Sequence, residues 1–156
     1  LEMLESLSVP VVVNCADRFP AFYSRDSGFP APARLDRPEQ FAEMMRAKWR
    51  IGMAGGMLIA NPIPSEDEIP AETIERAIAA AEAEMRSVGV GGKDATPFML
   101  AKINQLTGGA SLKANMALIK NNARLGAAIA LAYGELRPAR IRPARGLPRQ
   151  RDNGPR

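Results

Sequence analysis

The sequence of 156 residues contains no histidine and only one cysteine, Cys15. Common zinc sites use histidine and cysteine, and Ser-His and Cys-His nucleophile pairs need a histidine, so this chain cannot form such sites from its own residues. A single cysteine also excludes an intrachain disulfide, which favours a cytoplasmic location. No apolar run reaches the roughly 18 residues of a membrane-spanning helix, so we expect no membrane span and no membrane partner.

Aromatic residues are scarce, at 5%, whereas apolar residues make up 46% and charged residues 24% of the chain. These proportions are typical of a globular protein and exclude full disorder. The net charge of +4 comes from the end of the chain, because residues 137–156 contain seven arginines and one aspartate. Residues 1–136 are slightly acidic, with 14 basic and 16 acidic residues, so we do not expect the folded part to bind nucleic acid.

Proline and arginine dominate the sequence after Glu135, and the apolar periodicity ends there. We therefore expect one folded domain over residues 1–136 and a disordered Arg/Pro-rich tail over residues 137–156. The tail can be a solvated segment or a segment that binds RNA or an acidic surface, and the sequence leaves both interpretations open.

Alternating helical and strand patterns predict an α/β domain. Leu1, Leu4 and Leu7 have helical spacing, and short apolar runs at residues 9–13 and 57–60 predict strands that are buried on both faces. Further helices are predicted from caps, from prolines in the first turn and from apolar stripes. They begin after Asp36, at Pro70, at Thr96-Pro97 and at Ser111, and the last of them runs to about Tyr133.

An irregular segment at residues 17–29 holds four of the seven phenylalanine and tyrosine residues of the chain. Proline and glycine interrupt this segment, so neither a helix nor a strand is expected in it. A loop of this composition either covers or binds something, or packs its aromatic side chains back on the core. The sequence does not decide between these interpretations.

The last predicted helix carries two amides on an otherwise apolar face. This stripe consists of Asn115, Leu118, Ile119, Asn122, Leu125 and Ile129. Burying an amide without a hydrogen-bond partner costs about 1–3 kcal/mol, so we expect a partner for each amide. The partner can be a neighbouring backbone group or a ligand, and the spacing alone fits both. A carboxamide offers a donor and an acceptor, which suits the edge of a nucleobase.

The glycine-rich segments and the lysines give weaker signals. Gly108-Gly109 before Ser111 can hold an anion at the helix start, but the same residues are also ordinary helix punctuation. The glycines at residues 52–56 and 89–92 match neither a P-loop nor a dinucleotide fingerprint. The lysines at positions 93, 102, 113 and 120 are expected in solvent, and nothing marks one of them as an amine nucleophile.

Short motifs spread over about residues 1–133 form a specific set when they are taken together. They are Val9-Pro10-Val11-Val12, Phe19-Pro20-Ala21-Phe22-Tyr23-Ser24-Arg25, Ser27-Gly28-Phe29, Met45-Arg46-Ala47-Lys48-Trp49, Ala60-Asn61-Pro62-Ile63-Pro64, Thr96-Pro97-Phe98-Met99-Leu100, Leu106-Thr107-Gly108-Gly109, Ser111-Leu112, Ala114-Asn115 and Asn121-Asn122-Ala123-Arg124-Leu125. In this order and spacing, the motifs resemble the C-terminal half of pseudouridine-5'-phosphate glycosidase.

The resemblance implies the C-terminal portion of a three-layer α/β/α enzyme that is usually a homotrimer. Such enzymes interconvert pseudouridine 5'-phosphate and water with uracil and ribose 5-phosphate. The bond concerned is carbon–carbon, so protonating an oxygen leaving group in the usual glycosidase manner is not sufficient. The family uses a lysine that forms a Schiff base with the opened sugar, an acidic residue that handles protons, and a divalent metal, typically manganese (Mn2+), held through an aspartate.

In the family, the lysine, the acidic residue and the metal-binding aspartate precede the matched segment, so we assign none of them and no metal ligand to this chain. Asn115 matches an active-site asparagine near the uracil ring, which makes it the candidate catalytic and substrate-binding residue. Asn61, in the Asn-Pro-Ile-Pro turn, is a second candidate for substrate binding. We expect the chain to be inactive alone. The alternatives are a non-catalytic subunit or binding protein complemented by a separate N-terminal chain, and a degenerate gene product.

Overall fold

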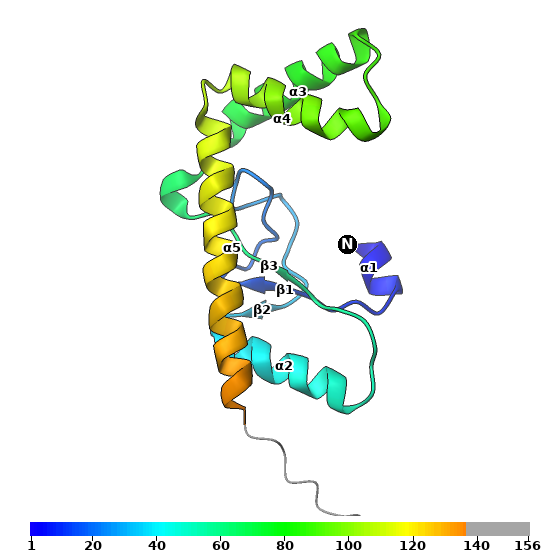
Figure 1. The fold of residues 1–156 in the computed structure, drawn as a ribbon, viewed down its shortest axis with the longest axis vertical. Helices are drawn as coiled ribbons and strands as arrows, with labels where there is room; N and C mark the ends of the chain where they lie inside the picture. Colours follow the sequence, from blue (N-terminus) through cyan, green and yellow to red (C-terminus); the bar gives the residue numbers. More distant parts are fainter. Residues whose placement is uncertain (137–156) are drawn as a thin grey trace, which may run out of the picture.

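The computed structural model of the chain describes residues 1–136 (Figure 1). The tail expected at residues 137–156 lies outside the described residues. Within residues 1–136, a parallel sheet of three strands lies among five α-helices and two short 3-10 turns. No helix in this part of the chain is both long enough and apolar enough to cross a membrane. The α/β class predicted from the sequence is confirmed.

The sheet consists of β1 (Val11–Asn14), β2 (Arg34–Leu35) and β3 (Leu58–Ala60), in the order β2-β1-β3. β1 is the central strand, and its Val12 and Val13 side chains are fully buried. β3 lies at an edge of this sheet and its Leu58 is exposed, so the prediction of a strand buried on both faces is wrong for residues 57–60. The sequence did not predict β2, because two residues that include an arginine show no strand pattern.

The helices are α1 (Glu2–Ser6), α2 (Pro38–Arg50), α3 (Ala71–Ser87), α4 (Ala95–Leu106) and α5 (Ala110–Glu135), and the 3-10 turns are η1 (Ser65–Asp67) and η2 (Gly92–Asp94). All five helices lie where the sequence predicts them, but two expected caps are wrong. Arg37 precedes the first turn of α2 in place of Asp36, because the Gln40 side chain accepts the backbone N–H groups of both residues at 3.0 Å.

Ser111 lies inside the first turn of α5 and does not cap it, because the helix already begins at Ala110. The backbone N–H of Ser111 donates to Thr107 Oγ1 at 3.1 Å, and its side chain hydrogen-bonds Tyr23. Burial raises the pKa of Tyr23, and this hydrogen bond partly offsets the effect. Because Thr107 Oγ1 already accepts one of the first N–H groups of α5, Gly108 and Gly109 fit helix punctuation better than an anion site.

Two hydrophobic clusters share α5. The first joins the start of α5 to α3, α4 and the aromatic loop (residues 17–29), and consists of Tyr23, Ile63, Ile69, Ile74, Ala77, Ala81, Ile103, Ala114 and Leu118. The second joins the later part of α5 to β1 and α2, and centres on Val12, Phe41 and Ile129. Figure 1 shows α3 and α4 near the start of α5 and α2 near its end. α5 is therefore the element that connects the two clusters.

The buried face of α5 differs from the predicted stripe. Ala114, Leu118 and Ile129 are buried, whereas Ile119 is 59% exposed. Asn122 is also exposed. The prediction was wrong in part because apolar residues lie on more than one side of this helix, so periodicity alone could not choose the buried side.

Candidate functional site

The carboxyl ends of the three parallel strands meet at one edge of the sheet, and each end carries a polar residue. Asn14 is the last residue of β1, Asp36 follows β2, and Asn61 follows β3. In open α/β sheets, ligands bind outside the carboxyl ends of the strands. These three residues, with Cys15 after β1, therefore define the candidate site, which we call the carboxyl edge.

A row of three asparagine amides crosses the carboxyl edge. Asn14 Nδ2 donates to Asn61 Oδ1 at 3.0 Å, and Asn61 Nδ2 donates to Asn122 Oδ1 at 3.1 Å. Beside this amide row, Asn121 Nδ2 donates to the carbonyl oxygen of Pro62 at 3.0 Å. The row runs in one direction, which leaves the amide N–H groups at Asn122, while the oxygen at Asn14 accepts from the Cys15 thiol. These bonds fix α5 against the ends of β1 and β3.

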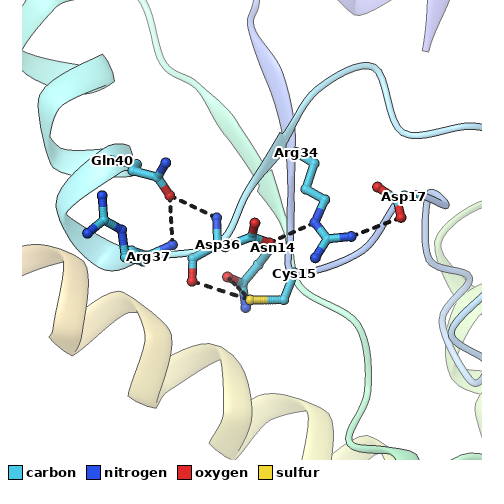
Figure 2. A network of polar contacts seen from close by, with 7 residues as sticks. All are labelled: Asn14, Cys15, Asp17, Arg34, Asp36, Arg37 and Gln40. Atoms are coloured by element: carbon cyan, nitrogen blue, oxygen red, sulfur yellow. Dashed lines mark hydrogen bonds and ion pairs between the residues drawn. The ribbon is translucent and has the colours of Figure 1, made fainter.

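An ion-pair network holds the ends of β1 and β2 together (Figure 2). Arg34 Nε donates to Asp36 Oδ1 at 2.7 Å, and Arg34 Nη1 donates to Asp17 Oδ2 at 2.9 Å. The hydrogen bonds with Asp36 and Asp17 raise the pKa of Arg34 above its ordinary value. Both carboxylates are therefore already paired with a cation.

The thiol of Cys15 lies between the ends of β1 and β2. Its Sγ contacts Asn14 Oδ1 and the carbonyl oxygen of Asp36, each at 3.4 Å (Figure 2). Cys15 has a φ of +53°, in the left-handed region that residues other than glycine seldom adopt. This backbone turn directs the chain away from the sheet directly after Asn14.

Asn115 lies on α5 and precedes Asn122 by seven residues, which places it about 10 Å nearer the start of the helix on the same side. Its side chain is half-buried and makes no hydrogen bond with any residue in 1–136. The Asn115 amide is therefore available to a ligand. Asn61 differs, because both ends of its amide belong to the amide row. The roles assigned to Asn115 and Asn61 in substrate binding stay predictions.

The sequence analysis missed Asn14 and Asn121, which the structure brings to the carboxyl edge. Asn14 closes a run of β-branched residues. A polar residue at the carboxyl end of a buried parallel strand is a signal that could have found it. Asn121 gave no such signal, because its bond to the Pro62 carbonyl depends on how α5 crosses the turn after β3.

The aromatic loop packs partly on the core and partly in solvent. Tyr23 is 6% exposed, whereas Phe22 and Phe29 are 50% and 62% exposed. Arg25 Nη1 donates to the carbonyl oxygen of the fully buried Ile63 at 2.6 Å. The loop is thus anchored to the turn that follows Asn61, while two of its rings face outward.

A buried lysine that the sequence did not single out holds the loop between α2 and β3. Lys48 is 6% exposed, and its Nζ donates to the carbonyl oxygens of Met53, Ala54 and Gly55 at 3.2, 2.5 and 3.2 Å. All three N–H groups of the ammonium are engaged. Lys48 is therefore a structural anchor and does not present a free amine to a substrate.

The expectation of solvated lysines is wrong at one position. Lys93, Lys113 and Lys120 are exposed, but Lys102 is half-buried and its Nζ lies 2.6 Å from Glu84 Oε2. α3 and α4 pack side by side, which brings this pair together. Among residues 1–136, no lysine combines a buried position with an unpaired amine.

The described residues do not form a metal centre. Residues 1–136 contain no group of three or more histidine, cysteine, aspartate or glutamate side chains that could hold a metal ion. At the carboxyl edge, Asp17 and Asp36 already pair with Arg34. The manganese that the resemblance implies therefore does not fit these residues, and no step of the chemistry is assigned to it here.

A parallel sheet whose carboxyl edge carries a row of amides defines an α/β protein with a candidate site for a polar ligand. More particularly, the chain belongs to the family described as Indigoidine synthase A like protein, whose family model matches residues 1–132. This membership agrees with the motifs that run through the same part of the sequence.

Curated relatives of the chain are named pseudouridine-5'-phosphate glycosidase. The relative from Methylobacterium nodulans is 51% identical over 148 residues, which cover 95% of this chain and 44% of the relative. The relative from a Nocardioides species is 53% identical over 137 residues, which cover 88% of this chain and 45% of the relative. The resemblance to this enzyme family is confirmed, and the chain spans a little under half the length of these relatives.

Solved structures support the same fold. The prealnumycin C-glycosynthase AlnA, solved in complex with ribulose 5-phosphate, matches with a TM-score of 0.76 and 29% identity over 85% of this chain and 43% of AlnA. An indigoidine synthase A-like protein from Thermotoga maritima matches with a TM-score of 0.72 and 37% identity over 84% of this chain and 44% of that protein. These matches confirm the prediction that the chain is a portion of the α/β fold of this family.

Proposed function

We propose that the chain is the C-terminal half of a pseudouridine-5'-phosphate glycosidase and supplies the nucleobase-binding side of its active site. The observation that carries this proposal is the unengaged amide of Asn115, on the same side of α5 as the amide row. Relatives that are 51% and 53% identical to this chain over the matched segment carry the name of that enzyme.

The chemistry of the amide suits uracil. The edge of uracil alternates carbonyl acceptors with ring N–H donors, and a carboxamide presents one acceptor oxygen and an NH2 donor. The Asn115 side chain can therefore pair with that edge through two hydrogen bonds. Asn61 holds Asn122 and thereby fixes α5 relative to the sheet, and its own contact with the substrate stays a prediction. In this proposal, Asn115 binds and orients the base while the carbon–carbon bond is cleaved or formed.

The sugar half of the reaction lies with residues outside this chain. By resemblance, the substrate is pseudouridine 5'-phosphate, the products are uracil and ribose 5-phosphate, and the Schiff-base lysine precedes the matched segment. AlnA, with its bound ribulose 5-phosphate, supports a sugar phosphate as the partner of the other half. The manganese ion, the homotrimer and the cytoplasmic location stay predictions.

We expect the isolated chain to release no uracil from pseudouridine 5'-phosphate, with or without added manganese. The reason is that no lysine of residues 1–136 offers a free buried amine and that residues 137–156 contain no lysine. The measurement is the amount of uracil released over time, determined by chromatography. A chimera that joins the unmatched part of the Methylobacterium nodulans relative ahead of Leu1 should turn over the same substrate. Turnover by the isolated chain, or none by the folded chimera, contradicts the proposal.

In the same chimera, we expect Asn115→Ala to raise the KM for uracil about tenfold in the synthetic direction, the loss that about 1.4 kcal/mol of hydrogen bonding represents. The KM for ribose 5-phosphate should stay unchanged, because Asn115 is assigned to the base. Lys120→Ala is the control, since this exposed residue on the same helix is given no role. An unchanged KM for uracil would remove Asn115 from the site.

A further inference from the structure

The side of α5 that points away from the rest of the chain is apolar along its length. Its residues are Leu112, Met116, Ile119, Ala123, Gly126, Ala127, Ala130 and Gly134, and all of them are exposed. They follow the three- and four-residue spacing of one helix face, and none carries a polar side chain. The largest of them, Leu112, Met116 and Ile119, are 53%, 51% and 59% exposed. We call this surface the outer face of α5.

A helix at the surface of a finished globular domain buries one stripe and turns polar residues to water. α5 does not follow this pattern, because Ala114, Leu118 and Ile129 are buried on one side while the opposite side is also apolar. The charged residues of its middle section, such as Lys120 and Arg124, lie on one flank between these two sides. A helix that is apolar on two opposite sides belongs to the interior of a larger fold.

We propose that the outer face of α5 packs against the remaining portion of the family fold, the part that this chain does not match. That portion is large, since the matched segment covers only 44% of the Methylobacterium nodulans relative and 43% of AlnA. It can therefore cover a helix of 26 residues, which is about 39 Å long. The inference rests on the half-length match and the proposed function above. Its test measures melting temperatures and therefore needs no substrate.

The proposed interface would also enclose the amides of the candidate site. Asn115 and Asn122 lie on the flank of α5 that separates the buried side from the outer face. A portion that covers the outer face reaches that flank and stands beside both amides. The Asn115 amide then lies at the interface between the two halves. The covering half removes this amide from water and thereby strengthens its hydrogen bonds to the base.

The test compares the same variant in two settings. Met116→Glu combined with Ile119→Glu should leave the melting temperature of the 156-residue chain unchanged, because both side chains face water there. In the chimera with the unmatched part of the Methylobacterium nodulans relative, the same variant should lower the melting temperature by about 4 °C or more, because two carboxylates would be buried. Lys120→Gln, an exposed charge change on the same helix, should be neutral in both.

Each result bears on the proposal. An equal shift in both settings, or no shift in the chimera, overturns it, and so does a chimera that fails to fold with the unaltered face. Sedimentation of the isolated chain is the second measurement. A dimer or trimer that the double variant dissociates would assign the outer face to a second copy and would also overturn the proposal. A chimera that folds and responds as expected but releases no uracil keeps this interface and refutes the proposed function.

Discussion

Replacing Lys48 with methionine is expected to lower the free energy of unfolding by about 3 kcal/mol. Methionine keeps most of the apolar stem but removes the ammonium that three backbone carbonyls share. These carbonyls lie in the loop between α2 and β3, so their loss of a partner frees the segment that positions β3. Urea unfolding of the variant and the parent chain measures the difference.

Lys93→Met is the matched control for this prediction. Lys93 is exposed and makes no hydrogen bond or ion pair within residues 1–136, so its replacement should change the free energy of unfolding by less than about 0.5 kcal/mol. Proteolysis should also cut the Lys48→Met variant faster at residues 51–57. Equal stability of the two variants would show that the three carbonyls are satisfied without Lys48.

The second large effect is expected at the centre of the amide row. Asn61→Ala removes both hydrogen bonds of the row and should lower the free energy of unfolding by about 2 kcal/mol. Asn122→Ala removes only one of them and should cost about 1 kcal/mol. Because the two residues share a bond, the double variant should cost no more than Asn61→Ala alone. Urea unfolding of the three variants measures this coupling.

Asn115→Ala supplies the control for the amide row, since Asn115 is an asparagine on the same helix with no hydrogen-bond partner in residues 1–136. Its replacement should cost less than about 0.5 kcal/mol. Strictly additive effects of Asn61→Ala and Asn122→Ala would contradict the row as a coupled unit. A cost at Asn115 as large as that at Asn61 would contradict the view that its amide is kept for a ligand.

The helices were predictable because their signals are local. The prolines at positions 38 and 70 and the apolar stripes between the glycine clusters place α2 and α3 within a few residues of their observed bounds. β1 was predictable for the same reason, since a β-branched run needs no distant partner to be recognised. β2 was not, because Arg34 and Leu35 become a strand only by pairing with Val13 and Asn14.

The candidate site was predictable only in part. Asn115 and Asn61 were named from the helical spacing, the turn after β3 and the family motifs. Neither spacing nor motif indicated that Asn61 would be engaged on both sides, because its partners are 47 and 61 residues away along the chain. The burial of Lys48 was equally hidden, since its three acceptors are backbone carbonyls whose direction depends on the loop conformation.

The sequence by itself determined the α/β class, the helices, the family and the half-length match. Periodicity and motif order can be recognised along the chain without knowing which distant residues come into contact. The tertiary structure alone decided which side of α5 is buried, which amides pair and which lysine is anchored. The physical reason is that α5 has apolar residues on two sides and carries several asparagines, so its sequence alone does not indicate which side is buried or which amides pair. Packing in both hydrophobic clusters selects one side of α5, and the position of α5 against β1 and β3 brings Asn14, Asn61 and Asn122 into contact.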